Sequence, residues 1–124
     1  MFHLLFLRCK KNVFTYVAHP DIFNFIGDVS LYQEKIRKLC VASRETGVPL
    51  ELNFLGIRDK RNYPNPDFWK VAGEEKSPVT FGFDSHDVFN AYDGESLKIA
   101  KEMVIKYNLN YIGKPKLISI QNNK

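Results

Sequence analysis

Three residues of the chain have side chains and positions that suit the binding of divalent metal ions. Asp84 and His86 are separated by one residue in the segment FDSHD, and alternate residues of an extended segment project to the same side. A carboxylate and an imidazole placed in this way can bind metal ions. His19, which begins the tripeptide His-Pro-Asp, is a third candidate ligand. Alone, each motif is more typical of a structural role, with Asp84 capping a turn and the histidines hydrogen-bonded in loops.

A cationic segment could bind the phosphate of a small molecule. Residues 56–64, GIRDKRNYP, hold Arg58, Lys60 and Arg61 next to a turn. The forked guanidinium groups of arginine match the oxygens of phosphate, so Arg58 and Arg61 are candidate ligands of a phosphate monoester. The alternative is a charged loop that faces solvent and binds nothing.

Three repeats of a strand, a loop and a helix are predicted to position these residues. Runs of β-branched, aromatic and other apolar residues predict strands at residues 13–18, 49–55 and 78–83. Apolar residues at helical spacing predict helices at residues 30–46, 67–76 and 95–107. We expect Ser30 to cap the first helix, Gly47 to end it and Pro66 to precede the second. The segment GIRDKRNYPNP between the second strand and the second helix is predicted to be a loop.

These repeats predict an α/β fold in which three to four parallel strands are joined by crossover helices. The carboxyl ends of parallel strands meet at one edge of the sheet, where the ligands of such folds bind. His19, the segment 56–64 and the D-x-H motif each follow a strand, so we expect them at this edge. The meeting of two histidines there strengthens the prediction of a metal site. Glu51 and Asn53 alternate with apolar residues, and they face either a barrel lumen or solvent.

The composition is that of a globular domain and excludes several other classes of protein. Hydrophobic residues make up 44% and charged residues 26% of the 124-residue chain, which excludes a disordered chain or a coiled coil. The net charge of +4 is scattered, so no nucleic-acid partner is predicted. The apolar start MFHLLFL is too short for a membrane span and lacks a cleavage site, so we expect no membrane partner. Cys9 and Cys40 form neither a C-x-x-C motif nor a disulfide framework, which indicates a cytoplasmic protein with both cysteines in packing roles.

The predicted sheet is incomplete, because three or four strands cannot close a barrel of about eight strands. We divide the chain into an apolar start at residues 1–12, a partial domain at residues 13–112 and a tail at residues 113–124. Either another copy or another chain covers the open edge, or these residues are the C-terminal part of a longer protein.

Three segments together resemble the C-terminal half of the PHP-domain histidinol-phosphatases. They are YVAHPD at 16–21, PLELNFLGIRDKRNYPNPDFWKVA at 49–72 and VTFGFDSHD at 79–87. Three ordered motifs with matching intervals are more specific than any one of them, and the resemblance covers residues 13–112. The pattern G-(I/L)-R-x-x-R-x-Y-P favours the histidinol-phosphatase branch over the polymerase-associated branch.

The resemblance implies the C-terminal part of a distorted (β/α)₇ TIM-like barrel with up to three divalent metal ions, of zinc, iron or manganese. It implies hydrolysis of L-histidinol phosphate to L-histidinol and phosphate, a step of histidine biosynthesis. By motif, His19, Asp84 and His86 would each be a ligand of one metal, with Asp84 and His86 also counted as catalytic. Arg58 and Arg61 would bind the substrate phosphate.

The chain also departs from the family pattern. The N-terminal H-x-H, further histidines and a bridging glutamate of the family lie in a first half that this sequence does not contain, and His3 stands outside any H-x-H. Phe83 replaces the usual small residue before Asp84.

We therefore expect a metal-dependent phosphomonoesterase that is inactive alone and is completed by the missing N-terminal half or by a homo-oligomer. The alternative is a non-catalytic half-barrel remnant or interaction module that pairs through its open sheet edge. A PHP nuclease is disfavoured, because no concentrated basic stripe is present.

Overall fold

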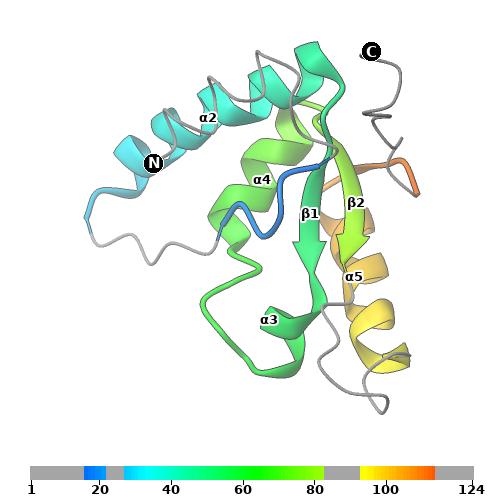
Figure 1. The fold of residues 1–124 in the computed structure, drawn as a ribbon. Helices are drawn as coiled ribbons and strands as arrows, with labels where there is room; N and C mark the ends of the chain where they lie inside the picture. The colour runs from blue at the N-terminus through cyan, green and yellow to red at the C-terminus, as the bar shows by residue number, and fades with distance from the viewer. Residues whose placement is uncertain (1–15, 22–26, 83–92, 114–124) are drawn as a thin grey trace, which may run out of the picture.

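A computed structural model of the chain describes residues 16–21, 27–82 and 93–113 (Figure 1). The helices in this part are α2 (Val29–Thr46), α3 (Phe54–Arg58), α4 (Pro66–Glu74) and α5 (Gly94–Lys106). The strands are β1 (Leu50–Asn53), β2 (Pro78–Gly82) and β3 (Asn110–Tyr111). Each strand is separated from the next by helices, as the sequence pattern predicts, with two helices instead of one between β1 and β2.

The strands form one parallel sheet whose order follows the chain. β1 pairs with β2, and β2 pairs with β3, both in parallel. Val17 extends the sheet beyond β1 through an isolated parallel bridge to Leu50. The Val17 N–H donates to the Pro49 carbonyl at 2.8 Å, and the Val17 carbonyl accepts from the Glu51 N–H at 2.9 Å. The predicted α/β fold with parallel strands is therefore confirmed, as an open sheet within the residues that the structure describes.

The two faces of the sheet differ in chemistry, because side chains alternate along each strand. One face carries apolar side chains, which are Leu50, Leu52, Val79 and Phe81. The other face carries polar side chains and a glycine, which are Glu51, Asn53, Thr80 and Gly82. Only 6% of Glu51 and 2% of Asn53 are exposed, so neither residue faces solvent.

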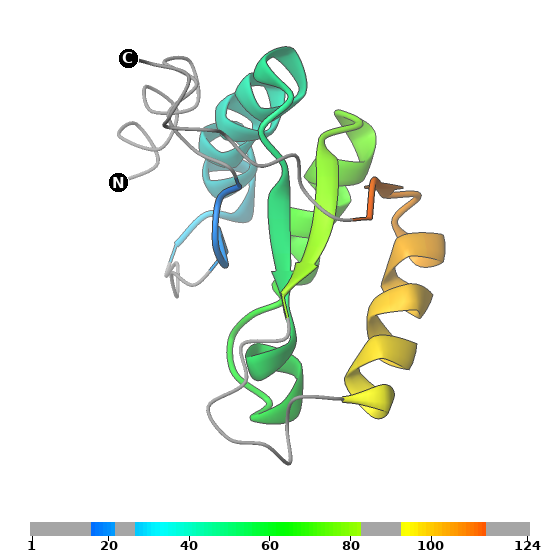
Figure 2. The same ribbon diagram turned by 45° about the vertical axis from the view of Figure 1, so that its right-hand side comes forward.

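The long helices cover the apolar face. Leu50, Leu52 and Val79 of the strands share one hydrophobic core with residues of three helices, namely Ile36, Leu39, Phe68, Trp69 and Ala100. α2 packs against α4, and α3 packs against α5. Figure 2 shows that β1 and β2 both run toward α3 and the start of α5. The carboxyl ends of the strands, where the site is expected, therefore lie at the α3 end of the molecule.

One side chain and one glycine set the ends of α2. The cap is Asp28, whose carboxylate accepts from the Ser30 N–H at 2.9 Å. The prediction that Ser30 caps this helix is wrong by two residues, because the carboxylate of Asp28 accepts from the Ser30 N–H and the helix begins at Val29. Gly47 ends the helix as predicted, with a φ of 75° that favours glycine.

The sequence predicts a strand that ends at residue 55 and then a loop up to the second helix, and the structure differs at residues 54–58 but agrees with the later part of the loop, residues 59–65. The strand ends at Asn53, whose Oδ1 accepts from the N–H groups of Leu55 at 3.0 Å and Gly56 at 3.3 Å. An asparagine in this position starts a helix, so the chain turns directly into α3. Arg58 therefore ends a helix instead of lying in an open loop.

The other predicted elements agree with the structure where they lie within the described residues. α4 and α5 match the predicted helices to within two residues, and β2 matches the predicted strand up to residue 82. Of the predicted strand at 13–18, residues 13–15 lie outside the described part, as do residue 83 and the tail from residue 114. β3 was not predicted.

None of the described helices combines the length and hydropathy that a membrane crossing requires.

Cys40 has the packing role that the sequence predicts, whereas Cys9 lies outside the described residues. The side chain of Cys40 is fully buried in the hydrophobic core. Burial raises the pKa of the Cys40 thiol to about 12, so the thiol stays protonated and unreactive near neutral pH.

We predict that Gly73→Ala destabilises the fold, because α4 passes close to the end of α5 at this residue. A methyl group at position 73 would overlap the backbone carbonyl oxygen of Tyr107. Such overpacking costs about 1–3 kcal/mol in the free energy of unfolding, which urea denaturation would measure. The exposed Lys70 of the same helix is the control, and Lys70→Ala should change stability by less than about 0.5 kcal/mol. Equal stability of the two variants would contradict the close approach.

Candidate functional site

His19 lies two residues after Val17, where the chain leaves the sheet next to β1. Its backbone φ is 26°, which lies in the left-handed region that side-chain-bearing residues rarely adopt. The His19 N–H donates to Glu51 Oε1 at 3.0 Å. The imidazole lies 5.9 Å from the ring of Tyr63, measured between centroids. The structure thus places this predicted ligand at the polar face of the sheet.

Glu51 and Asn53 form the polar face beside His19. Asn53 Nδ2 donates to Glu51 Oε1 at 2.9 Å, so this oxygen accepts two hydrogen bonds. The carboxylate lies against Gly82 of β2, where a methyl group would overlap Glu51 Oε2. The alternation of polar and apolar residues in the predicted strand 49–55 is the sequence signal that Glu51 and Asn53 share one face of the sheet. This alternation did not show which face of the sheet would be covered.

Asp21 fixes the other end of the His-Pro-Asp segment. Its Oδ2 accepts from the Asn65 N–H at 2.6 Å and from Trp69 Nε1 at 2.8 Å, which attaches this segment to the start of α4. Only 1% of Asp21 is exposed, and its Oδ1 has no hydrogen-bond partner in the described part of the chain. Desolvation raises the pKa of Asp21 to about 6, although its hydrogen bonds and the charge of His19 oppose the rise. Sequence reasoning missed this role, because the partners lie more than forty residues away.

Arg58 is held in a partly buried ion pair. Its NH1 donates to Asp93 Oδ2 at 3.0 Å, and the two side chains are 12% and 10% exposed. Asp93 Oδ1 also accepts from the Ser96 N–H at 3.0 Å and so caps α5. Desolvation acts to raise the pKa of Asp93, but the hydrogen bonds from Ser96 and Arg58 together lower it. The ion pair therefore fixes the guanidinium of Arg58 between the end of α3 and the start of α5.

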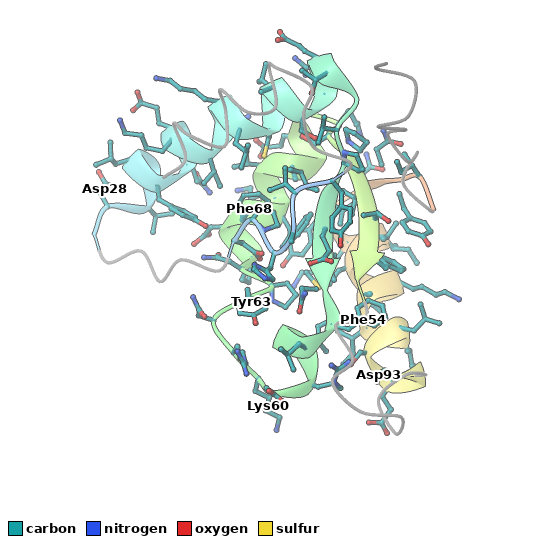
Figure 3. The ribbon with its side chains drawn as sticks, in the orientation of Figure 1. Asp28, Phe54, Lys60, Tyr63, Phe68 and Asp93 are labelled. Atoms are coloured by element: carbon teal, nitrogen blue, oxygen red, sulfur yellow. The ribbon has the colours of Figure 1, made fainter. Side chains whose placement is uncertain are left out.

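Arg61 lies in a more exposed environment than Arg58. Its NH2 pairs with Asp59 at 3.1 Å, and both side chains are 47% exposed. Its NH1 donates to the hydroxyl of Tyr63 at 3.4 Å. Figure 3 shows Tyr63 beside the carboxyl end of β1 and Asp93 farther along, at the start of α5. His19 and Arg61 thus both contact Tyr63, whereas Arg58 is held by Asp93 on α5.

Asp84 and His86 lie outside the described residues, between the end of β2 and Asp93. Among the described residues, no three His, Cys, Asp or Glu side chains form a group that could hold a metal ion. Of the predicted ligands, only His19 belongs to the described residues. The nearby donors, an imidazole and the buried carboxylate of Glu51, are of types that zinc, iron and manganese accept.

One hollow in the described part of the surface lies away from this edge. Its volume is about 670 Å³, and it lies against the outer side of α2, lined by residues such as Gln33, Arg37 and Lys38. The lining residues all come from α2 and, apart from Val41, are polar or charged, and they form no convergent set of catalytic groups. The strand edge is therefore the better candidate site.

No protein-family profile, curated protein or solved structure matches the chain. The side chains at the strand edge and the three sequence motifs are the observations that bear on function.

We predict that Asp21 makes the protein less stable as the pH rises. The pKa of Asp21 is 3.8 in an open environment and about 6 in the folded protein, so between these values the folded state keeps a proton that the unfolded state has lost. The stability contributed by protonated Asp21 is present below pH 4 and is lost as the pH rises through 6. Between pH 4 and 7, Asp21→Asn should gain up to about 3 kcal/mol relative to the unsubstituted chain.

The measurement is urea unfolding of both proteins at several pH values between 4 and 7. Asp93→Asn is the control, because the pKa of Asp93 is lowered and its contribution is instead lost as the pH falls. Between pH 4 and 7 the stability difference between Asp93→Asn and the unsubstituted chain should therefore stay nearly constant, whereas the difference for Asp21→Asn should grow as the pH rises. A curve for Asp21→Asn that stays parallel to that of the unsubstituted chain would contradict the assignment.

Proposed function

We propose that the chain is the C-terminal half of a metal-dependent phosphomonoesterase of the PHP histidinol-phosphatase type. The observation that carries this proposal is the position of His19 at the carboxyl edge of a parallel sheet, on a buried polar face formed by Glu51 and Asn53. A metal-ligating histidine of a barrel hydrolase would occupy such a place, because barrel active sites lie at the carboxyl ends of the strands.

The topology supports the barrel part of the proposal. The order Val17, β1, β2, β3 never reverses along the sheet. Doubly wound sheets reverse their strand order, whereas barrels add each new strand on the same side. The helices cover the apolar face and leave the polar face on the side that a closed barrel would enclose. We therefore propose a distorted (β/α)₇ barrel, of which this chain supplies the later strands.

The proposed ligands of the divalent ions are His19, Asp84 and His86. With zinc, iron or manganese bound, such a site gains a Lewis acid and a water activated near neutral pH. Asp84 would in addition orient the attacking water. Arg58 and Arg61 would bind the phosphate oxygens, with Asp93 holding the guanidinium of Arg58 in place.

The proposed substrate is a small phosphate monoester, L-histidinol phosphate, in the cytoplasm. The missing ligands of the family would come from an N-terminal half or from a second copy of the chain. A nucleic acid is not proposed as a partner, because the excess of eighteen Lys and Arg over fourteen Asp and Glu is small.

One observation favours the alternative of an interaction module. β3 is short, both of its residues are exposed, and Tyr111 stacks on Phe81 with 4.2 Å between ring centroids. An aromatic pair at the last strand of the described sheet is a surface on which another chain could pair. This alternative predicts concentration-dependent association without metal-dependent turnover.

We predict that phosphate is released from L-histidinol phosphate only when the chain is mixed with the separately expressed N-terminal half of a full-length homologue and with manganese or zinc. His19→Ala and His86→Ala should each lower turnover by more than the roughly 10–100-fold that loss of a supporting residue costs. His3→Ala is the matched control and should keep full activity. If His19→Ala and His86→Ala leave turnover unchanged, the ligand assignment is contradicted. If no mixture shows turnover, the result favours the interaction module.

We also predict that Arg58→Gln raises KM in the complemented mixture by about 10–100-fold, because a hydrogen bond to a charged group is worth about 1.5–3 kcal/mol. Arg37→Gln is the control, because Arg37 also pairs with carboxylates but does so on the outer side of α2 and α4. Steady-state kinetics would measure both variants, with their unfolding curves recorded in parallel. An unchanged KM for Arg58→Gln would remove Arg58 from the proposed phosphate site.

A further inference from the structure

The carboxylate of Glu51 joins three segments at the polar face. Its Oε1 accepts from the His19 N–H at 3.0 Å and from Asn53 Nδ2 at 2.9 Å. On the side of β2, the carboxylate lies against Gly82 without space for a methyl group between them. From this arrangement we infer that Glu51 is a positioning residue that sets the orientation of His19 for ligand binding. The inference rests on the proposed function, in which His19 is a metal ligand.

The backbone of His19 requires support from its surroundings. A φ of 26° places this residue in the left-handed region, which is unfavourable for a residue other than glycine. The proline that follows narrows the conformations open to His19 still further. The His19 N–H needs an acceptor, and either a carboxylate oxygen or an amide oxygen at position 51 can serve as one. The bond to Glu51 can therefore offset the cost of this conformation and fix the direction in which the imidazole leaves the backbone.

Asn53 holds Glu51 in turn. While its Nδ2 donates to Glu51, its Oδ1 accepts from the first N–H groups of α3, those of Leu55 and Gly56. α3 is the helix that ends at Arg58. Glu51 and Asn53 therefore connect the candidate metal ligand His19 with the helix that carries the candidate phosphate ligand. A shift of the Glu51 carboxylate would change both ends of the site together.

Two substitutions separate the geometry of this acceptor from its charge. Glu51→Gln keeps an Oε1 that can accept both hydrogen bonds but removes the negative charge. Glu51→Leu removes the acceptor and keeps a side chain of similar size. If Glu51 acts by positioning, Glu51→Gln should stay close to the unsubstituted chain and Glu51→Leu should not.

The first measurement is made on the metal-free chain by NMR, with the His19 resonances assigned from His19→Gln. Glu51→Leu should shift the His19 backbone N–H and imidazole resonances, while Glu51→Gln should largely retain the imidazole positions. The second measurement is zinc affinity, determined by competition with a chromophoric chelator. Zinc binding should weaken about 10–100-fold in Glu51→Leu and stay within a few-fold in Glu51→Gln.

Thr80→Val is the matched control for a structural effect. Thr80 faces the same side of the sheet opposite Glu51, is equally buried and donates to the Gly113 carbonyl at 2.7 Å. Its loss should lower stability without moving the His19 resonances or the zinc affinity. Equal loss of zinc affinity in Glu51→Gln and Glu51→Leu would overturn the inference, because the charge and not the acceptor geometry would then matter.

The two measurements distinguish failure of this inference from failure of the proposed function. If the unsubstituted chain binds no zinc, the metal site fails, and the His19 resonances still decide whether Glu51 orients that residue. If zinc binds but the His19 resonances are the same in Glu51→Leu, the metal site stands and the positioning role is wrong.

Discussion

The alternation of apolar and polar residues along β1 is the constraint on which the rest of the structure depends. Leu50 and Leu52 face the helices and belong to the hydrophobic core, while Glu51 and Asn53 face the opposite side. A shift in register by one residue would place a carboxylate in that core, at a cost of several kcal/mol. The same alternation therefore directs two residues of β1 into the core and the other two toward the candidate site.

Three buried or partly buried carboxylates attach the segments at the strand edge to the rest of the fold. Glu51 accepts from His19, Asp21 accepts from Asn65 and Trp69, and Asp93 accepts from Ser96 and Arg58. Each one satisfies N–H groups that have no partner within a helix or strand. They differ in how their charge is balanced. The Asp93 carboxylate has a guanidinium partner and a lowered pKa, whereas burial dominates at Asp21 and raises its pKa.

Local patterns predicted the long elements and failed where a single side chain decides the boundary. The periodicity in α2, α4 and α5 is strong enough to predict these helices within two residues. The short helix α3 depends on Asn53, which also fits an extended strand, so the pattern could not show that the strand would stop there. β3 has two residues and therefore too short an alternation to detect.

The position of His19 was predictable from the sequence, but its contacts were not. A histidine that follows a strand must lie near the strand edge, and the structure places His19 there. The supporting groups depend on distant pairings: Asp21 contacts Trp69, and Glu51 contacts His19 from another strand. Sequence spacing holds no information about such pairs until the order of the strands is known. For that reason the sequence left open whether Glu51 faces a barrel lumen or solvent.

The buried polar face bears on the choice between a catalytic half-barrel and a simple interaction module. A module that binds only through its sheet edge gains nothing from a glutamate and an asparagine buried on one face, since burying polar groups costs free energy unless they are paired. Here Glu51 and Asn53 are paired with each other, with His19 and with the start of α3. These hydrogen bonds hold His19 in an unfavourable backbone conformation at the carboxyl edge of the sheet. Strain kept in place by a buried polar network is typical of functional sites, which favours the catalytic half-barrel.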